Sequence, residues 1–204
     1  MHIDILYFGT MGWEDKQKTG LLPNVYCLHK QRNLPHNIEM QSNWNPEYLY
    51  IVFAWVVTIP TLLLLIPKNK ISVAVVAFLF MQLLTWVLGL IVVQLGLIEY
   101  PVRLFPKANM TSFTFEFLVY PSICAIFMVH YPENKSRLKQ LLYYAAYCTG
   151  ITIVEVLVER YTDIIVYKHW RWYTTWLSLL ATLYINRKLI GWFFRRVEKE
   201  ARMH

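Results

Sequence analysis

ISVAVVAFLFMQLLTWVLGLIVVQLGLI, residues 71–98, contains no charged side chain, and its only strongly polar residues are Gln82 and Gln94. An uncharged apolar run of about 18 residues or more is long enough for a helix to cross the ~30 Å hydrocarbon core of a bilayer. The segment from Tyr48 to Leu65 also lacks any charge. Both segments are therefore predicted to be transmembrane helices, and the longer one has room to tilt.

Three less apolar segments follow these two in the chain. They are Phe113–Tyr131, Leu138–Val158 and Trp172–Phe194. The first contains Glu116, the second contains Glu155, and the third contains Arg187 with Lys188. A charge at mid-depth costs about 2.5–3.5 kcal/mol on insertion scales, so such side chains usually face the bundle or reach an interface. The predicted fold is an all-α polytopic membrane helical bundle of about five transmembrane helices.

The last of these segments leaves two alternatives open. If its helix exits the membrane near Asn186, Arg187 and Lys188 contact headgroups, and the following residues lie along the membrane surface. If the helix continues, Arg187 is deep enough to require a carboxylate partner.

The overall composition agrees with a membrane location. Of the 204 residues, 56% are hydrophobic and 16% are aromatic, which is unusual for a soluble domain. The formal net charge is +7. Basic residues flank the apolar runs and form no separate module, so the expected partners are the lipid bilayer and its anionic headgroups, and not nucleic acid. The alternative partners are another membrane protein or a further copy of this chain in a homo-oligomer.

The composition divides the chain into three parts. Residues 1–46 are polar and are expected to be interfacial or partly disordered, residues 47–196 form the transmembrane bundle, and residues 197–204 form a basic tail. No cleaved signal pattern begins at Met1.

The distribution of Lys and Arg predicts the orientation. More basic residues lie inside if the loops at 67–70 and 132–137 are placed on the same side as the tail. The protein is therefore expected in the cell membrane with a cytoplasmic C-terminus.

Spacings typical of metal sites and catalytic motifs are not found. Cys27, Cys124 and Cys148 show no paired spacing, and the last two are expected to be small core residues. His130 and His169 stand alone, and there is no G-x-S-x-G, Gly-rich phosphate loop or H-E-x-x-H. The sequence thus indicates no catalytic residue, metal or cofactor.

Carboxylates follow the apolar part of the fourth predicted helix. EVLVERYTD, residues 155–163, places Glu155, Glu159 and Asp163 at intervals of four. On a helix they share one face, although like charges at this spacing cost about 0.2–0.5 kcal/mol per pair. Glu155 lies deepest from the loop and is expected to be paired or protonated.

The segment before the third predicted helix is rich in proline. Pro101 and Pro106 prevent the second helix from continuing, so a bent connector ordered against the bundle is expected. Pro121 frees the carbonyl of Phe117 within the third helix. Two alternatives are open: a kink that only shapes packing, or a broken-helix binding site as in transporters.

The acidic residues and several bases lie at one predicted end of the bundle. The candidate ligand or ion-coupling residues are Glu116, Glu155, Glu159, Asp163, Arg103, His169 and Arg171, with Lys107 beside them. One hypothesis is a set of ion pairs that holds the helices in register. The other is a cation or proton site in which burial keeps a carboxyl group protonated.

Spaced acidic and aromatic positions carry a resemblance to a known family. These are FP at 105–106, FTFEFLVYP at 113–121, EVLVERYTDIIVY at 155–167 and WRWY at 170–173. The chain resembles a family of small multi-pass membrane proteins of spore-forming Firmicutes whose function is not established. The resemblance extends over roughly residues 70–195. It implies an integral membrane location and a helical bundle, and it assigns no catalytic residue.

Two functions from different classes are consistent with these features. The first is a structural or accessory interaction subunit of the membrane. The alternative is a small transporter or an ion- or proton-coupling protein that uses Glu116, Glu155 and Glu159.

Overall fold

The structure is a computed structural model that describes residues 46–202. The predictions for residues 1–45, including Cys27, and for the last two residues of the tail lie outside this range. The described elements in chain order are α2 (Pro46–Leu65), the short 3-10 helix η1 (Lys68–Lys70), α3 (Ile71–Gln94), β1 (Ile98–Glu99), the π-helical turn η2 (Phe115–Val119), α4 (Tyr120–Val129), α5 (Arg137–Tyr161), β2 (Val166–Tyr167) and α6 (Trp172–Ala201).

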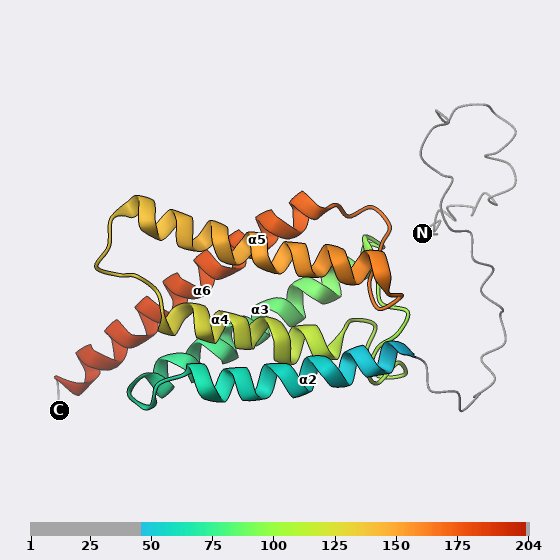
Figure 1. The fold of residues 1–204 in the computed structure, drawn as a ribbon. Coiled ribbons are helices and arrows are strands. Elements are labelled where there is room, and N and C mark those ends of the chain that lie inside the picture. The colour runs from blue at the N-terminus through green and yellow to red at the C-terminus, as the bar shows by residue number, and fades with distance from the viewer. Residues whose placement is uncertain (1–45, 203–204) are drawn as a thin grey trace, which may run out of the picture. The chain divides into compact units, whose positions relative to one another are not determined.

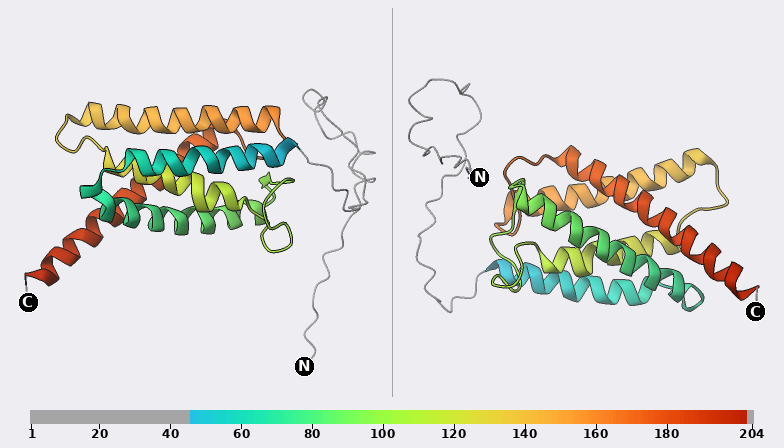
Figure 2. Two further views of the ribbon diagram at one scale, coloured as in Figure 1. Left: turned by 60° about the horizontal axis from the view of Figure 1, so that its bottom comes forward. Right: turned by 180° about the vertical axis from the view of Figure 1, so that it is seen from behind.

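Successive long helices run in opposite directions through the bundle (Figure 1). α4 packs against α2 and α3, and α6 packs against α3 and α5. We call the end with the 66–70 and 130–136 turns and the last part of α6 the basic end. The opposite end, with the 95–114 connector and the 162–171 loop, is the connector end. Figure 2 shows the same arrangement from two further sides.

Within the described chain, three helical segments are long and apolar enough to cross a membrane. They are Glu47–Leu65, Lys68–Gln94 and Arg137–Tyr161. The apolar helix Phe115–Val129 is shorter, about 22 Å long at 1.5 Å per residue. The fold is therefore helical as predicted, apart from the two short strands, and three of the expected spans meet the criteria of length and composition.

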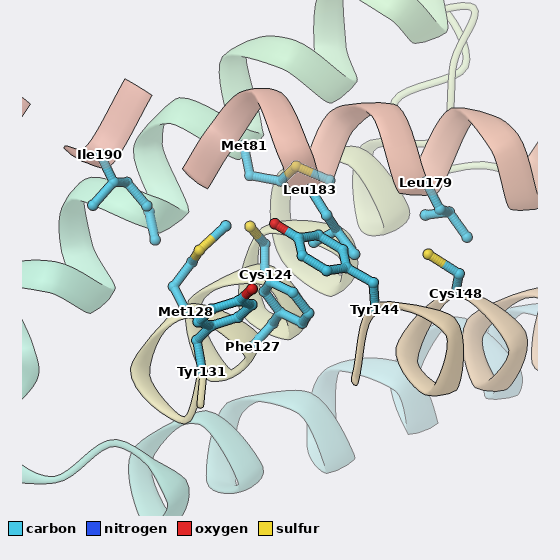
Figure 3. Close-up of a cluster of buried hydrophobic side chains, with 11 residues drawn as sticks. Met81, Cys124, Phe127, Met128, Tyr131, Tyr144, Cys148, Leu179, Leu183 and Ile190 are labelled. Atoms are coloured by element: carbon cyan, nitrogen blue, oxygen red, sulfur yellow. The ribbon is translucent and has the colours of Figure 1, made fainter. Parts of the chain in front are cut away.

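Aromatic and sulfur-containing side chains fill the centre of the bundle. Phe127 is fully buried, and its ring centroid lies 4.9 Å from those of Tyr143 and Tyr144. Cys124 and Cys148 are buried free cysteines in the same cluster, which confirms their prediction as core residues. Figure 3 shows that these side chains converge from α3, α4, α5 and α6.

The outer faces of the helices are strongly apolar. Leu63 and Leu64 of α2 are 73% and 82% exposed, and many further large apolar side chains are exposed along α2, α3 and α5. Exposed apolar surface of this extent requires a nonpolar environment. This surface is consistent with a bundle surrounded by lipid.

Helix α6 continues without interruption beyond Asn186 to Ala201. Asn186 is buried, and its side-chain amide donates a hydrogen bond of 2.9 Å to the Ala77 carbonyl of α3. Arg187 has the carboxylate that a continuing helix requires, because its guanidinium lies 3.6 Å from Glu133. The residues after Asn186 thus continue α6 and form no separate helix, while the point at which α6 leaves the membrane stays a prediction.

Candidate functional site

The connector end is closed by a short pairing of two strands. Ile98 of β1 pairs with Tyr167 of β2 in an antiparallel arrangement. The main-chain N–H groups of Lys168 and His169 also donate to the Leu97 carbonyl, at 3.0 and 3.2 Å. This pairing holds residues 97–99 against the 162–171 loop and fixes the position of Tyr167 over the end of the bundle. Further along the connector Thr111 and Ser112 are buried, as expected for a segment ordered against the bundle.

Glu155 of α5 is buried among hydroxyl groups. Its side chain is 8% exposed. Tyr120 donates to Oε2 at 2.5 Å, while Tyr167 and Thr175 donate to Oε1 at 2.5 and 2.9 Å. Three elements besides α5 therefore supply donors to one carboxylate: α4, β2 and α6.

The proton count of this network suits an ionised Glu155. Trp170 Nε1 donates to Thr175 Oγ1 at 2.8 Å, which leaves the Thr175 hydroxyl proton for the carboxylate. A phenol carries one proton, and Tyr120 and Tyr167 each place theirs on Glu155. The carboxylate accepts from every neighbouring hydroxyl and needs no proton of its own. Such hydrogen bonds to a charged acceptor are the strong ones.

A cavity of about 470 Å³ lies beside Glu155, between α5 and the helix that contains η2. Its wall is almost entirely apolar, and includes Val119, Ile123, Ile151 and Val154. An apolar cavity of this kind offers a hydrated ion no replacement for its water ligands. The surroundings of Glu155 therefore favour a fixed structural role over an ion pathway.

Glu116 lies in a second buried environment, against α3. It is 3% exposed, and Thr111 Oγ1 lies 2.6 Å from its Oε2, while no described group hydrogen-bonds to Oε1. A Cβ atom added at Gly89 of α3 would lie 1.9 Å from Oε1. The carboxyl group thus occupies space that only a glycine at position 89 leaves open.

Protons are distributed differently around Glu116. Thr111 Oγ1 also lies 2.9 Å from Asn109 Oδ1, whose identity as oxygen is set by the Thr111 N–H at 3.1 Å. One hydroxyl proton cannot serve both Asn109 and Glu116. If Thr111 donates to Asn109, Glu116 must carry a proton and donate to Thr111. With a protonated Glu116, both of these short contacts are hydrogen bonds with their own proton.

The substitution Glu116→Gln tests this proton count. The amide of the new side chain would donate to Thr111 as the carboxylic acid does, so we expect the free energy of unfolding to stay within about 0.5 kcal/mol of the original value. Chemical or thermal unfolding in detergent measures the change. A loss of roughly 2 kcal/mol or more would mean that Glu116 is ionised in the folded state.

The π-helical turn shapes the backbone beside Glu116. The Tyr120 N–H donates to the Phe115 carbonyl, five residues earlier, and the Thr85 hydroxyl of α3 lies 2.8 Å from the Glu116 carbonyl. Helical structure is continuous from residue 113 to 129 through Pro121. The broken-helix alternative is therefore wrong, and the structure has a widened turn whose carbonyl reaches a neighbouring helix.

Tyr100 of the connector lies near both acidic residues. Burial raises the pKa of its phenol well above the ordinary value, and the charges of Glu155, and of Glu116 when ionised, raise it further. Tyr100 is therefore a neutral hydroxyl between the two environments. The two carboxyl groups lie at the same end of the bundle, as predicted, and each has its own set of partners.

Arg103 does not pair with the acidic residues. Its guanidinium donates to the carbonyls of Tyr100, Asn109 and Pro106, at 2.6, 2.7 and 3.2 Å. Arginine has enough donors to satisfy several carbonyls of an irregular segment. Arg103 thus stabilises the bend of the connector, and its prediction as a partner of the carboxylates is corrected.

The other predicted bases are exposed at the same end. Lys107, His169 and Arg171 all have high exposure. Among residues 46–202, no ion pair joins a Lys, Arg or His side chain to Glu116 or Glu155. The ion pairs expected for these two carboxyl groups are replaced by hydrogen bonds with hydroxyl groups, which avoid the cost of burying a second charge.

Glu159 and Asp163 are half-buried, nearer the loop than Glu155. Burial, then the charge and hydrogen bond of Glu155, raise the pKa of Tyr167, and the charge of Glu159 adds to this effect. Glu155 is the most buried of the three acids, in line with its predicted position furthest from the loop. α5 ends at Tyr161, however, so Asp163 lies in the loop, and the prediction that all three acids share one helix face is wrong. No group of three or more His, Cys, Asp or Glu within the described range could hold a metal ion.

Comparison with protein-family models, curated proteins and solved structures gives no match to this chain.

Several residues of the site were not indicated by the sequence. They are Gly89, Thr111, Tyr120, Tyr167 and Thr175. Tyr120 could have been noticed, because it lies four residues after Glu116 and 35 residues before Glu155 on a neighbouring helix. No feature of the sequence points to Gly89 or Thr175 as site residues, since an isolated glycine or threonine in an apolar helix is common.

Proposed function

We propose that the chain is a multi-pass protein of the cell membrane with five spans, acting as a structural or accessory interaction subunit. The observation that carries this proposal is the buried Glu155 carboxylate, held by hydroxyl groups of three further elements. This carboxylate is already stabilised by three hydroxyl donors, so it does not need a bound cation to offset its burial. Its role is to hold α4, α5, α6 and the connector-end loop in one arrangement.

The alternation of the helices supports a count of five spans. α4 is short, but helical structure extends back through η2 to residue 113, and Thr111, Ser112 and Thr114 around that start are buried, so this part of the chain reaches into the bundle. α6 contains 30 residues, about 45 Å, and its central polar residue Asn186 faces α3 rather than lipid. Both helices thus run alongside the three apolar spans.

Orientation is tested by reporter fusions at Asn134 and Lys168. These residues lie at the basic end and the connector end, and the excess of Lys and Arg at the basic end supports a cytoplasmic C-terminus. We expect the fusion at Asn134 to report the cytoplasm and the fusion at Lys168 the opposite side. Equal signals from both would mean that α5 does not cross the membrane.

We also propose membership of the spore-former family that the sequence resembles. The resembling motifs contain Glu116, Tyr120, Glu155, Tyr167 and Trp170, which are the two buried acids and three members of the Glu155 network. Their coincidence supports a shared structural requirement at these positions.

Glu116 supports the second candidate function, proton coupling. Its Oε1 has no hydrogen-bond partner among the described residues. Its Oε2 lies beside the Thr111 hydroxyl, which also contacts Asn109, and when Glu116 is ionised these two hydrogen bonds have only one proton between them. A buried carboxyl group that gains and loses a proton is the usual element of a membrane proton relay.

Reconstitution in liposomes with a trapped pH-sensitive dye separates the two functions. For a structural subunit, an applied potential is expected to produce no proton flux beyond that of protein-free liposomes. A flux that Glu116→Gln abolishes in a folded protein would replace the first function by the second.

The accessory role has its own test in native membranes. Extraction in mild detergent is expected to give a complex of fixed stoichiometry, with a second membrane protein or a second copy. A monodisperse monomer under several detergents would contradict this role.

A further inference from the structure

A large cavity opens at the basic end, between α3, α4, α5 and α6, with a volume of about 1010 Å³. One part of its wall is apolar and includes Val73, Met128, Leu180 and Ile190. The other part carries charge: Arg137, Arg187, Lys188 and Arg195, with Glu133 as the one acidic residue that lines it. The cavity therefore combines an apolar wall with a strongly basic rim, formed by these four cationic side chains.

The basic side chains are held toward aromatic rings and the helix backbone. The Arg187 guanidinium lies 3.5 Å from the Tyr131 ring centroid and contacts Glu133 at 3.6 Å through one nitrogen. Lys188 lies 5.3 Å from the Tyr184 ring centroid. These cation–π contacts orient the cations without neutralising them.

Arg195 is also oriented but not neutralised. Its Nε donates to the Gly191 carbonyl at 2.8 Å, which leaves the two terminal nitrogens of the guanidinium for another acceptor. With one carboxylate for four cations, the rim keeps a net positive charge. Guanidinium groups in this state are suited to phosphate oxygens.

Tyr144 provides an independent sign of a missing polar partner. It lines the cavity, it is 8% exposed, and its hydroxyl has no hydrogen-bond partner among the described residues. Figure 3 shows its ring beside Tyr131 and Met128, between α4, α5 and α6. An unpaired buried hydroxyl costs about 1–3 kcal/mol, which Tyr144 would recover if its hydroxyl, closed off from the cavity in this structure, turned to an acceptor oxygen of a bound ligand.

The position along α6 matches the depth of lipid headgroups. Arg187 and Arg195 lie 15 and 23 residues after Trp172, which begins α6, so about 22 and 34 Å of helix separate them from it, and the two side chains bracket the far edge of a ~30 Å hydrocarbon core. Leu141 and Leu177, which also line the cavity, are 61% and 56% exposed on the lipid-facing surface. The apolar wall is thus continuous with the space that acyl chains occupy, and the rim lies where hydrocarbon gives way to headgroups.

We propose that this cavity binds one anionic phospholipid, with its headgroup phosphate on Arg187, Lys188 and Arg195 and an acyl chain along the apolar wall. A membrane lipid fits better than free phosphate, because the wall continues onto the exposed surface of α5 and α6. The inference rests on the membrane location proposed above, which the reporter fusions test separately. It is independent of the roles of Glu116 and Glu155, which lie at the opposite end.

The test uses the full-length protein in detergent and native mass spectrometry. Phosphatidylglycerol is the probe, and phosphatidylcholine and inorganic phosphate are the comparison arms. We expect one phosphatidylglycerol molecule to be retained at least about tenfold more strongly than phosphatidylcholine. Equal retention of the two lipids, or the same thermal stabilisation by inorganic phosphate as by phosphatidylglycerol, would overturn the proposal.

Two variants locate the binding site. The double variant Lys188→Gln with Arg195→Gln is expected to lose most of the phosphatidylglycerol preference. The matched control is Lys139→Gln with Lys199→Gln, which removes the same charge from exposed residues at the same end that do not line the cavity. An equal loss in both variants would show a diffuse charge effect and refute a discrete site.

Tyr144→Phe keeps the ring packing and removes the unpaired hydroxyl, so it gives a second measurement if the double variant does not fold. We expect it to reduce phosphatidylglycerol retention several-fold and to leave phosphatidylcholine retention unchanged. Unchanged retention of phosphatidylglycerol in this folded variant would show that the phosphate is not bound at the proposed position.

Discussion

Replacing Glu155 with leucine is expected to lower the free energy of unfolding by roughly 3 kcal/mol or more. Leucine has a similar volume but cannot accept hydrogen bonds, so the hydroxyls of Tyr120, Tyr167 and Thr175 would lose their acceptor. Each buried donor left without a partner costs about 1–3 kcal/mol. Thermal unfolding in detergent should show a melting temperature lower by roughly 6–12 °C, at about 2–4 °C per kcal/mol for a chain of this size.

The matched control is Glu159→Leu, one helical turn nearer the loop. Glu159 is half-buried and belongs to the same acidic face, so a general effect of removing acidic charge would appear in both variants. We expect the Glu159 variant to change the melting temperature by much less. If Glu155→Leu is as stable as the original protein, the network does not hold the bundle together.

Glutamine distinguishes the two buried acids. At position 155 an amide group presents protons to hydroxyls that already donate, so Glu155→Gln should lose about 1 kcal/mol. A structural role alone predicts a tolerated glutamine, because the shape and one hydrogen bond are kept, but the three donors around Glu155 change that expectation. At position 116, where one proton is missing, glutamine should be tolerated.

The second large effect is expected at Gly89. In Gly89→Ala the new methyl group would lie 1.9 Å from Oε1 and 2.6 Å from Cδ of the Glu116 side chain. Glu116 is buried and its Oε2 is held near Thr111, so the carboxyl group has to shift and lose this contact. Overpacking of this kind costs about 1–3 kcal/mol, which chemical unfolding in detergent will measure.

A double-mutant cycle separates this clash from an effect on α3 alone. Glu116→Ala removes the atoms that collide, so Gly89→Ala should cost much less in the Glu116→Ala background, with a coupling energy of about 0.5–3 kcal/mol. Additive effects of the two changes would contradict the close approach of α3 to Glu116.

Gly150→Ala is the control for glycine replacement itself. Position 150 lies within α5, and a Cβ atom there would meet nothing within 4 Å. Alanine is the better helix former by about 1 kcal/mol, so this variant is expected to be as stable as the original protein or more stable. The two Gly→Ala changes should therefore have opposite signs.

Together the two carboxyl groups define the chemistry of the connector end. Glu155 has three hydroxyl donors and no missing proton, whereas Glu116 has one polar neighbour and an oxygen without a partner among the described residues. Burial alone does not distinguish them, since both are below a tenth exposed. The difference lies in the donors around each group, which is why a structural role suits Glu155 and a titrating role suits Glu116.

The sequence by itself determined which helices are able to cross a bilayer and the order of the acids in depth. An uncharged run such as residues 71–98 has one stable form in lipid, because every backbone group must be bonded within the segment. The prediction of α2, α3 and α5 depended only on local composition and length, and the structure contains all three. The four-residue spacing of Glu155 and Glu159 likewise placed Glu155 one helical turn further from the loop, whereas Asp163 lies beyond the end of α5.

Tertiary structure alone decided what these residues contact. The Glu155 network joins positions 120, 155, 167 and 175, and the approach of Gly89 to Glu116 joins α3 to the turn before α4. Such contacts depend on how each helix is rotated and shifted against its neighbours. In an apolar helix nearly every face is hydrophobic, so no pattern of polar and apolar residues records that rotation. Arg103 shows the same limit, because only the folded connector brings three carbonyls to a guanidinium that charge alone had assigned to the carboxylates.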